Sequence, residues 1–367
     1  MMDPLKQLRE YGQSVWMDYF RRDLIVKGEL SRMIHDDGLA GITTNPTIFE
    51  KAVNESADYD EALTKLLDAD PHIDAATVYE KLSVEDIRMA ADVLRPVYDR
   101  LRGGDGFVSI EVSPYLSRDT EGTIAEARRL WREVNRPNVM VKIPATAEGI
   151  PAIEACLSDG ININITLMFS LAHYRAVAEA FLRGAARCPH LETLSSVASV
   201  FVSRIDTIID RDLQSIGTPA ALDLRGKVAI ANAKVIYNEF RNVFDGERFA
   251  KLRDRGVRVQ RVLWGSTGTK NPAYSDVLYV EELIGPQTIN TMPLKTLSAF
   301  RNHGRVRGTT VQDGLELAQA QLEWLRKLNI DLDAATEKLQ QEGLAGFRAS
   351  LDKLVDGIAH KARAVYG

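Results

Sequence analysis

The chain has 367 residues, of which 45% are hydrophobic and 26% are charged, and its formal net charge is −5. Its length allows one elaborated domain or two, and the absence of long runs of like charge argues against a nucleic-acid surface. Only two cysteines occur, and there is neither a leader-like N-terminus nor a run of about 18 apolar residues, so we expect a cytoplasmic protein that does not bind membranes.

Eight short segments rich in β-branched residues recur along the chain and alternate with longer segments of helical spacing. We expect strands at residues 14–19, 41–45, 107–113, 138–144, 162–169, 194–202, 261–267 and 288–292. A strand followed by a helix, repeated eight times, is typical of an α/β protein with a closed parallel sheet. The pattern therefore predicts a (β/α)8 TIM barrel with additional helices.

The helical segments follow the same order. We expect helices at residues 23–35, 124–135, 170–186, 223–240 and 293–302. Residues 51–106 are too many for one crossover, so two or three inserted helices are expected there. Residues 311–328 and 333–364 predict C-terminal helices that pack on the outside of the barrel. No low-complexity linker divides the chain, which favours a single barrel domain over residues 1–367.

The fourth expected strand contains a lysine at an unusual place. Side chains of a barrel strand alternate between the interior and the helix layer. Val139, Val141 and Ile143 form the apolar set that faces the helices, which leaves Met140 and Lys142 pointing into the barrel. A lysine in this position either forms a buried ion pair or acts in catalysis.

Other strands also direct polar side chains inward by the same alternation. These residues are Asp18, Thr43, Asn45, Glu111, Asn164, Thr166 and Ser266. Each alone has a structural explanation, such as a helix cap for Asp18, a turn for Asn45 or a satisfied core hydroxyl for Thr166. Together they favour a catalytic site, because a buried polar group that stays unpaired costs about 1–3 kcal/mol.

A lysine nucleophile with two carboxylates fits imine formation with a ketone, followed by cleavage or formation of a carbon–carbon bond. The amine must be deprotonated to react, and a carboxylate beside it opposes this. We therefore expect Asp18 and Glu111 to act through solvent or substrate. The six histidines lack HxH and HExxH spacing, which disfavours a metal, and no nucleotide-binding motif or cofactor motif follows a strand.

The segment from Gly265 to Lys270 follows the seventh expected strand. It places Ser266, several backbone amides and Lys270 where barrel enzymes often hold a phosphate, and Arg204 could complete the site. The alternative is a turn with solvated surface cations.

Several segments resemble the transaldolase family and occur in the family's order. They are SVWMDYF around Asp18, GITTNPTIFEKA from Gly41, SIEVSP around Glu111, NVMVKIPAT around Lys142, NINITLMFS from Asn162, ASVFVSRID from Ala198 and TINTMP from Thr288. The length and the inserted helices look most like the longer bacterial members.

The resemblance implies a pentose phosphate pathway enzyme that moves a dihydroxyacetone unit between sugar phosphates without a cofactor. Lys142 would form the Schiff base, and Asp18 would take and return the proton of the C4 hydroxyl. Glu111 would work with Thr166 through a water.

The resemblance also implies a substrate-binding set. Thr43, Asn45, Asn164 and Ser199 would hold the dihydroxyacetone portion. Arg204 and Ser266 would bind the phosphate, and Lys270 stands near the place where shorter members carry an arginine. Since an ammonium lacks the bidentate fork of a guanidinium, the exchange would alter phosphate binding.

Two other functions stay open. One is a fructose 6-phosphate aldolase, which uses the same Schiff base but releases free dihydroxyacetone; Phe201 favours transaldolase, because the aldolase type usually has tyrosine there. The other is a catalytically silent barrel that serves as a scaffold. The expected partners are small sugar phosphates, and a homo-oligomer is left open.

Overall fold

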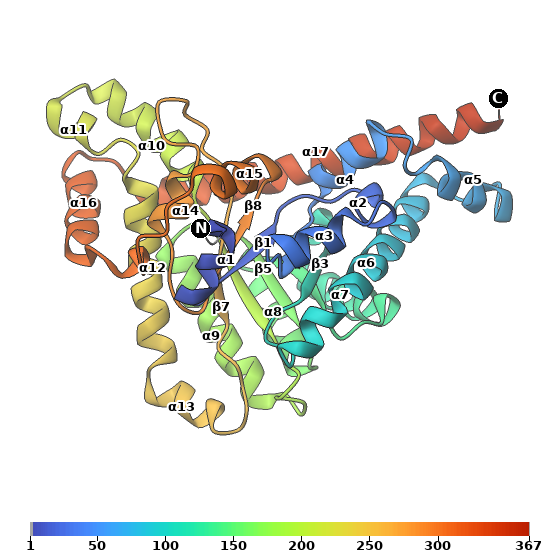
Figure 1. Ribbon diagram of the computed structural model, residues 1–367, viewed down its shortest axis with the longest axis horizontal. Helices are drawn as coiled ribbons and strands as arrows, with labels where there is room; N and C mark the ends of the chain where they lie inside the picture. The colour runs from blue at the N-terminus through green and yellow to red at the C-terminus, as the bar shows by residue number, and fades with distance from the viewer. Residues whose placement is uncertain (1–2, 367) are drawn as a thin grey trace.

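The computed structural model describes residues 3–366, with side chains for residues 3–363. Eight parallel strands form a closed barrel in which each strand pairs with the next and β8 pairs with β1 (Figure 1). The strands are β1 (Gln13–Met17), β2 (Gly41–Ile42), β3 (Phe107–Glu111), β4 (Val139–Pro144), β5 (Ile163–Met168), β6 (Ser196–Phe201), β7 (Arg261–Gly265) and β8 (Thr288–Met292). The predicted TIM barrel is confirmed.

The first two strands end earlier than expected. Asp18 follows the end of β1, and Thr43 follows the end of β2. Both still bond to a neighbouring strand, since the Asp18 N–H donates to the carbonyl of Met292 at 2.8 Å and the Thr43 N–H to that of Met17 at 2.9 Å. Their side chains are thus fixed at the carboxyl-terminal rim of the barrel.

Helices surround the barrel. They are α1 (Pro4–Leu8), α2 (Arg22–Val26), α3 (Glu29–Asp36), α7 (Thr120–Val134), α8 (Gly149–Ser158), α9 (Leu171–Arg187), α10 (Ser203–Ile216), α11 (Pro219–Asp223), α12 (Val228–Phe244), α13 (Glu247–Arg253), α14 (Leu278–Glu282) and α15 (Leu294–His303).

Two expected helices are altered at a glycine. Gly28, with a φ of 72°, divides the one expected at residues 23–35 into α2 and α3, and Gly226, with a φ of 70°, precedes α12, which begins at Val228 instead of residue 223. This left-handed conformation ends a helix and is favourable mainly for glycine. The pattern also did not predict α8 and α10.

Three helices lie between β2 and β3, namely α4 (Pro46–Asn54), α5 (Asp60–Ala69) and α6 (Ala75–Arg100). Asn45 caps the first of them, because its side-chain oxygen accepts a hydrogen bond from the N–H of Ile48 at 3.0 Å. The turn that was considered for Asn45 is therefore present, and it fixes the direction in which α4 leaves the rim.

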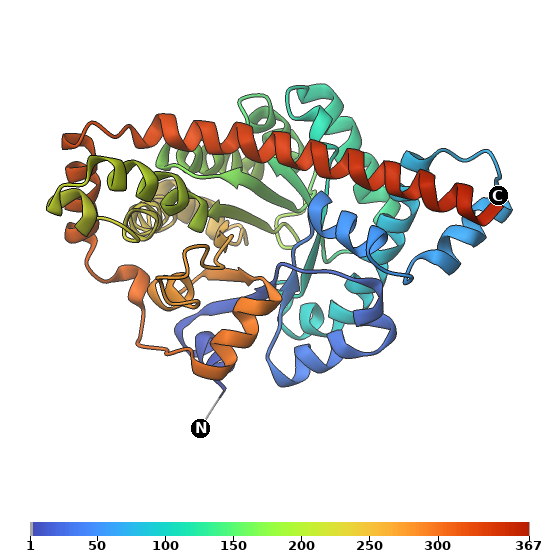
Figure 2. The ribbon, with the colours of Figure 1, turned by 90° about the horizontal axis from the view of Figure 1, so that it is seen from above.

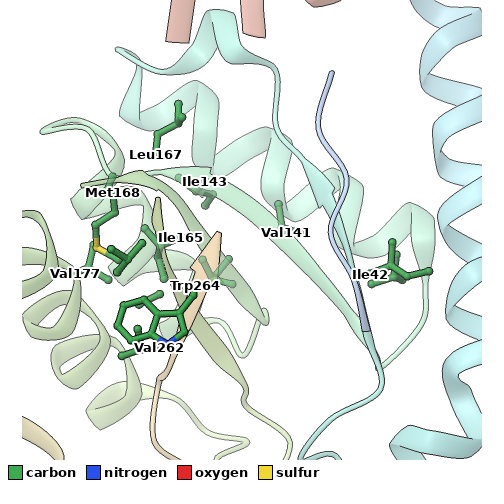
Figure 3. Packing of buried hydrophobic residues seen from close by; sticks show 14 of the residues in the cluster. Ile42, Val141, Ile143, Ile165, Leu167, Met168, Val177, Val262 and Trp264 are labelled. Carbon is green, nitrogen blue, oxygen red and sulfur yellow. The ribbon is translucent and has the colours of Figure 1, made fainter. Parts of the chain in front are cut away.

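The two faces of the strands pack into separate apolar clusters. Met140 belongs to a cluster that includes Trp16, Phe107 and Leu263. Val141 belongs to the larger cluster between strands and helices, where Met168 of β5 lies beside Val177 of α9 (Figure 3). The alternation predicted for β4 is therefore confirmed, and Lys142 shares the inward face with Met140.

The last two helices differ from each other in position. The helix α16 (Leu315–Lys327) packs on α12, at the side of the barrel. The helix α17 (Leu332–Tyr366) instead crosses the molecule as the long red helix of Figure 2. The side-chain amide of Gln340 on α17 donates to the carbonyls of Ala145 and Leu167, both at 3.0 Å, just past β4 and near the end of β5.

The expectation that both C-terminal helices pack on the outside is therefore wrong for α17. It covers part of the carboxyl-terminal end of the barrel, because an amphipathic pattern indicates that one face is buried but not which surface that face covers. Within residues 3–366, neither α17 nor any other helix has an apolar stretch of the length that a bilayer span requires.

Candidate active site

A cavity of about 490 Å³ opens at the carboxyl-terminal end of the barrel, where TIM-barrel enzymes place their active sites. Most of the residues that the sequence indicated for the site line this cavity. They are Asp18, Thr43, Asn45, Lys142, Thr166, Ser199, Arg204, Ser266 and Lys270. Glu111 and Asn164 do not line it and lie behind residues that do. Side chains from six strands or strand ends thus converge on one space.

Lys142 lies at the wall of the cavity and is 4% exposed. Its Nζ donates to the carbonyl of Thr44 at 2.9 Å and lies 3.4 Å from Oε2 of Glu111. The Glu111 side chain is 7% exposed, so the amine and the carboxylate form a nearly buried pair. The amine has room on the cavity side for a substrate carbonyl.

Asp18 and Glu111 were expected to act through solvent or substrate rather than beside the amine of Lys142. This expectation is wrong for Glu111. In the pairing of β3 with β4, Glu111 stands directly opposite Lys142. Paired residues of neighbouring strands point to the same face, so the two side chains meet. Register between strands is a tertiary property, which the alternation within one strand does not reveal.

Burial controls the acidity of both carboxyl groups. It raises the pKa of Glu111, and the charge of Lys142 opposes this rise. Burial also raises the pKa of Asp18, against the opposing effects of Lys142 and of the hydroxyl of Thr43, which donates to Asp18 Oδ1 at 2.8 Å. A carboxyl whose pKa is raised toward neutral pH can both accept and donate a proton, as general acid–base catalysis requires.

A chain of hydrogen bonds supports the wall beside Lys142. The hydroxyl of Ser199 donates to Asn164 Oδ1 at 2.6 Å, and Asn164 Nδ2 donates to the hydroxyl of Ser109 at 2.9 Å. Asn164 therefore orients Ser199. In contrast, the buried hydroxyl of Thr166 has no hydrogen-bond partner among the described residues. It lines the cavity and is available to a ligand or a water.

Two cations and a serine also line the cavity, and none of the three lies within a strand. Arg204 lies in the first turn of α10, with its guanidinium 5.6 Å from the ring centroid of Phe201. Burial lowers the pKa of Arg204, and the charge of Asp18 opposes this change. Ser266, with a φ of 53°, lies 3.1 Å from the hydroxyl of Ser203. Among residues 3–363, neither Arg204 nor Lys270 forms a salt bridge, so both can bind an anion.

Some lining residues were not expected from the sequence. Thr291 of β8 lines the cavity, and its hydroxyl lies 2.8 Å from that of Thr43. The alternation along β8 could have identified it. Lys51 of α4 and Phe347 of α17 also line the cavity. No local signal could have identified them, because their positions depend on where their helices pack.

The amino-acid sequence matches the family model described as Transaldolase/Fructose-6-phosphate aldolase over residues 15–358. The transaldolase of Thermobifida fusca is 45% identical over 368 residues, which cover 99% of this chain and 100% of the relative. The transaldolase of Thiobacillus denitrificans is 45% identical over 358 residues, covering 96% and 99%. Transaldolase 1 of Streptomyces coelicolor is 46% identical over 358 residues, covering 96% and 93%.

The family match begins in β1 and reaches into α17, so it includes every strand of the barrel and every residue discussed for the cavity. The similarity to the three relatives also extends over nearly the whole of each protein. The chain belongs to the transaldolase/fructose-6-phosphate aldolase family.

Proposed function

We propose that this chain is a transaldolase, which transfers a dihydroxyacetone unit from a ketose phosphate to an aldose phosphate in the pentose phosphate pathway. The observation that carries the proposal is the position of Lys142. Its amine is nearly buried beside Glu111 and faces a cavity that also holds Arg204 and Lys270. An amine nucleophile and an anion site in one cavity suit a phosphorylated ketone.

The reaction begins when the amine of Lys142 attacks the C2 carbonyl of the ketose. Loss of water from the resulting carbinolamine needs a proton donor, and Glu111 is the acid beside the nitrogen, 3.4 Å away. The unpartnered hydroxyl of Thr166 holds the water that moves between Glu111 and the substrate. The product of this stage is an iminium ion on Lys142.

Cleavage then requires a base on the C4 hydroxyl. Asp18, held by Thr43, takes this proton, the C3–C4 bond breaks, and an aldose phosphate leaves. The electron pair of the broken bond stays on the three-carbon unit as an enamine. When the acceptor aldose arrives, C3 attacks its aldehyde carbon and Asp18 returns the proton to the new hydroxyl. Water then adds to C2 of the new iminium ion, and the carbinolamine breaks to release the ketose phosphate and return the amine of Lys142.

The phosphate of the sugar binds where two cations and a serine line the cavity. Arg204 supplies a guanidinium, Ser266 a hydroxyl and Lys270 an ammonium group. The dihydroxyacetone portion lies among Thr43, Asn45 and Ser199, with Asn164 orienting Ser199. We also propose a cytoplasmic location, in keeping with two cysteines that are both free and buried.

Reductive trapping tests the proposal. The protein is incubated with fructose 6-phosphate and borohydride, and the added mass is mapped by peptide mass spectrometry. A three-carbon adduct on Lys142 is expected. Erythrose 4-phosphate is then supplied, and formation of sedoheptulose 7-phosphate distinguishes a transaldolase from an aldolase that only releases dihydroxyacetone. A folded protein without any adduct would instead support the silent-barrel alternative.

A further inference from the structure

The ring of Phe347 forms part of the cavity wall beside the reactive amine. Its centroid lies 6.0 Å from Nζ of Lys142, and the residue is 5% exposed. Phe347 comes from α17, far from the barrel strands in the sequence. Phe201, another phenylalanine that lines the cavity, lies against Arg204 instead. The two aromatic rings thus border different functional groups.

Hydrogen bonds on both sides of Phe347 fix α17 over the barrel. Before it, Gln340 binds two carbonyls at the ends of β4 and β5. After it, Arg348 donates to the carbonyl of Pro114 at 3.2 Å and to the hydroxyl of Ser117 at 2.8 Å. Between them, Gly343 lies so close to Leu167 that a Cβ would be only 2.7 Å from the leucine side chain. The ring is therefore held in place rather than left at a mobile edge.

The enamine on Lys142 has two fates, which differ in what adds to C3. In transfer, C3 attacks the acceptor aldehyde, whereas in release a proton adds to C3. Both fates give an iminium ion and end alike, because water then adds to C2 and the carbinolamine breaks to free the ketone product and return the amine. Because a phenyl ring neither donates nor accepts strong hydrogen bonds, a water that could carry a proton to C3 is disfavoured on the side of the enamine that the ring covers.

We propose that Phe347 is a specificity-determining residue that favours transfer over release by keeping water, and the proton it would carry to C3, away from the enamine on Lys142. The inference rests on the proposed transaldolase function and deepens it. Removal of the ring would leave a space beside the amine of Lys142. A space that is roomy and polar fills with water, whereas an apolar one stays dry.

The test compares Phe347→Ala and Phe347→Leu with the unaltered chain. Release is measured as the steady production of glyceraldehyde 3-phosphate from fructose 6-phosphate without an acceptor, after the first turnover. Transfer is measured as sedoheptulose 7-phosphate formed when erythrose 4-phosphate is present. We expect Phe347→Ala to raise the ratio of release to transfer by about tenfold, and Phe347→Leu to raise it less, because leucine still covers part of the space.

Leu354→Ala is the matched control, since Leu354 is fully buried on the same helix and does not line the cavity. It should lower stability without changing the ratio. Borohydride trapping on Lys142 checks that each variant still forms the Schiff base, and circular dichroism checks folding. If Phe347→Ala does not fold, the ratio of release to transfer measured for Phe347→Leu decides whether the inference holds.

An unchanged ratio in folded variants that still form the adduct would overturn the inference and leave the proposed function intact. An equal change in Leu354→Ala would also overturn it, because the effect would then come from general loosening of α17. Failure of the unaltered chain to form any adduct would overturn the proposed function, and the inference with it.

Discussion

Around Lys142, here called the lysine part of the cavity, the functional side chains come from neighbouring strands. Around Arg204, Ser266 and Lys270, here called the phosphate part, they come from the start of a helix and from a loop. Lys142 and Glu111 stand opposite each other in β4 and β3, and both are nearly buried. Arg204 lies in the first turn of α10, and Lys270 is exposed in the segment after β7. Under the proposed function, the barrel strands would fix the groups that make and break bonds, and the peripheral segments would supply charge to hold the substrate.

This difference has energetic consequences. A side chain on a paired strand has little freedom, so a change at the lysine part should affect the rate of the chemical step. An exposed cation on a loop is well solvated and contributes less to binding. Variants at the phosphate part should therefore act mainly on KM. Four predictions, which use five variants, test this contrast, and the expected effects decrease in the order given below.

The largest effect is expected for Lys142→Arg. Arginine keeps the charge but does not form an imine, so turnover should fall by about 10⁴-fold or more. The transfer assay measures the loss, and mass spectrometry should find no adduct after borohydride treatment. Lys65→Arg, at an exposed lysine of α5, is the matched control and should retain activity. Substantial activity in a folded Lys142→Arg chain would place the nucleophile elsewhere.

Glu111→Gln should lower kcat by about 10²- to 10³-fold, because the nitrogen loses its adjacent acid and base. The pH profile adds a second readout. Since burial raises the pKa of Glu111, its carboxylate is lost as the pH falls through a value above the ordinary glutamate range. The acid limb of kcat/KM, which reports the pKa values of the free enzyme, should lie correspondingly high in the unaltered chain and change shape in the variant.

Glu126→Gln is the control for this prediction. Glu126 is a partly buried glutamate whose pKa is also raised by burial, but it does not line the main cavity. It should leave kcat and the acid limb nearly unchanged. A similar loss in both variants would mean that the effect arises from burial of charge in this region rather than from the position of Glu111.

At the phosphate part, Arg204→Ala should raise KM for fructose 6-phosphate by about 10- to 100-fold, and Lys270→Met by less than about tenfold. The smaller effect for Lys270 follows from its exposure. Trapping of unphosphorylated dihydroxyacetone on Lys142 should be unaffected by either change. Arg211→Ala, at an exposed arginine of α10 paired with Asp212, is the control. A loss of trapping in Arg204→Ala would contradict the division between the two parts.

The smallest expected effect concerns a residue that supports the phosphate part. Asp206 of α10 accepts hydrogen bonds from the N–H of Ala229 at 2.8 Å and from the hydroxyl of Tyr279 at 2.9 Å. Burial raises the pKa of Asp206 to about 7. The folded chain therefore binds a proton here that the unfolded chain has already lost, and stability should decrease as the pH rises toward that value.

From about pH 5 to about pH 8, the free energy of unfolding should fall by about 2 kcal/mol more in the unaltered chain than in Asp206→Asn. Urea denaturation at several pH values measures this difference. Asp212→Asn, at an exposed aspartate, should show the same pH dependence as the unaltered chain. If the free energy of unfolding of Asp206→Asn changes with pH in parallel with that of the unaltered chain, Asp206 keeps an ordinary pKa in the folded state.

The sequence alone determined the barrel and the inward direction of the lysine. Both depend on local periodicity, because the side chains of a strand alternate with period two wherever the strand lies. The apolar set of β4, with Val141 outside and Met140 inside, left only one direction for Lys142. The convergence of polar side chains at one end followed from the same alternation, since parallel strands bring their carboxyl ends together.

Only the tertiary structure decided which of these side chains meet. The contact between Glu111 and Lys142 depends on the register of β3 against β4, and the place of Phe347 depends on how α17 packs. Neither is encoded in a short window of sequence. Register and helix packing are set by the combined contacts of segments far apart in the chain, so the wall of the cavity became visible only once those segments were in place.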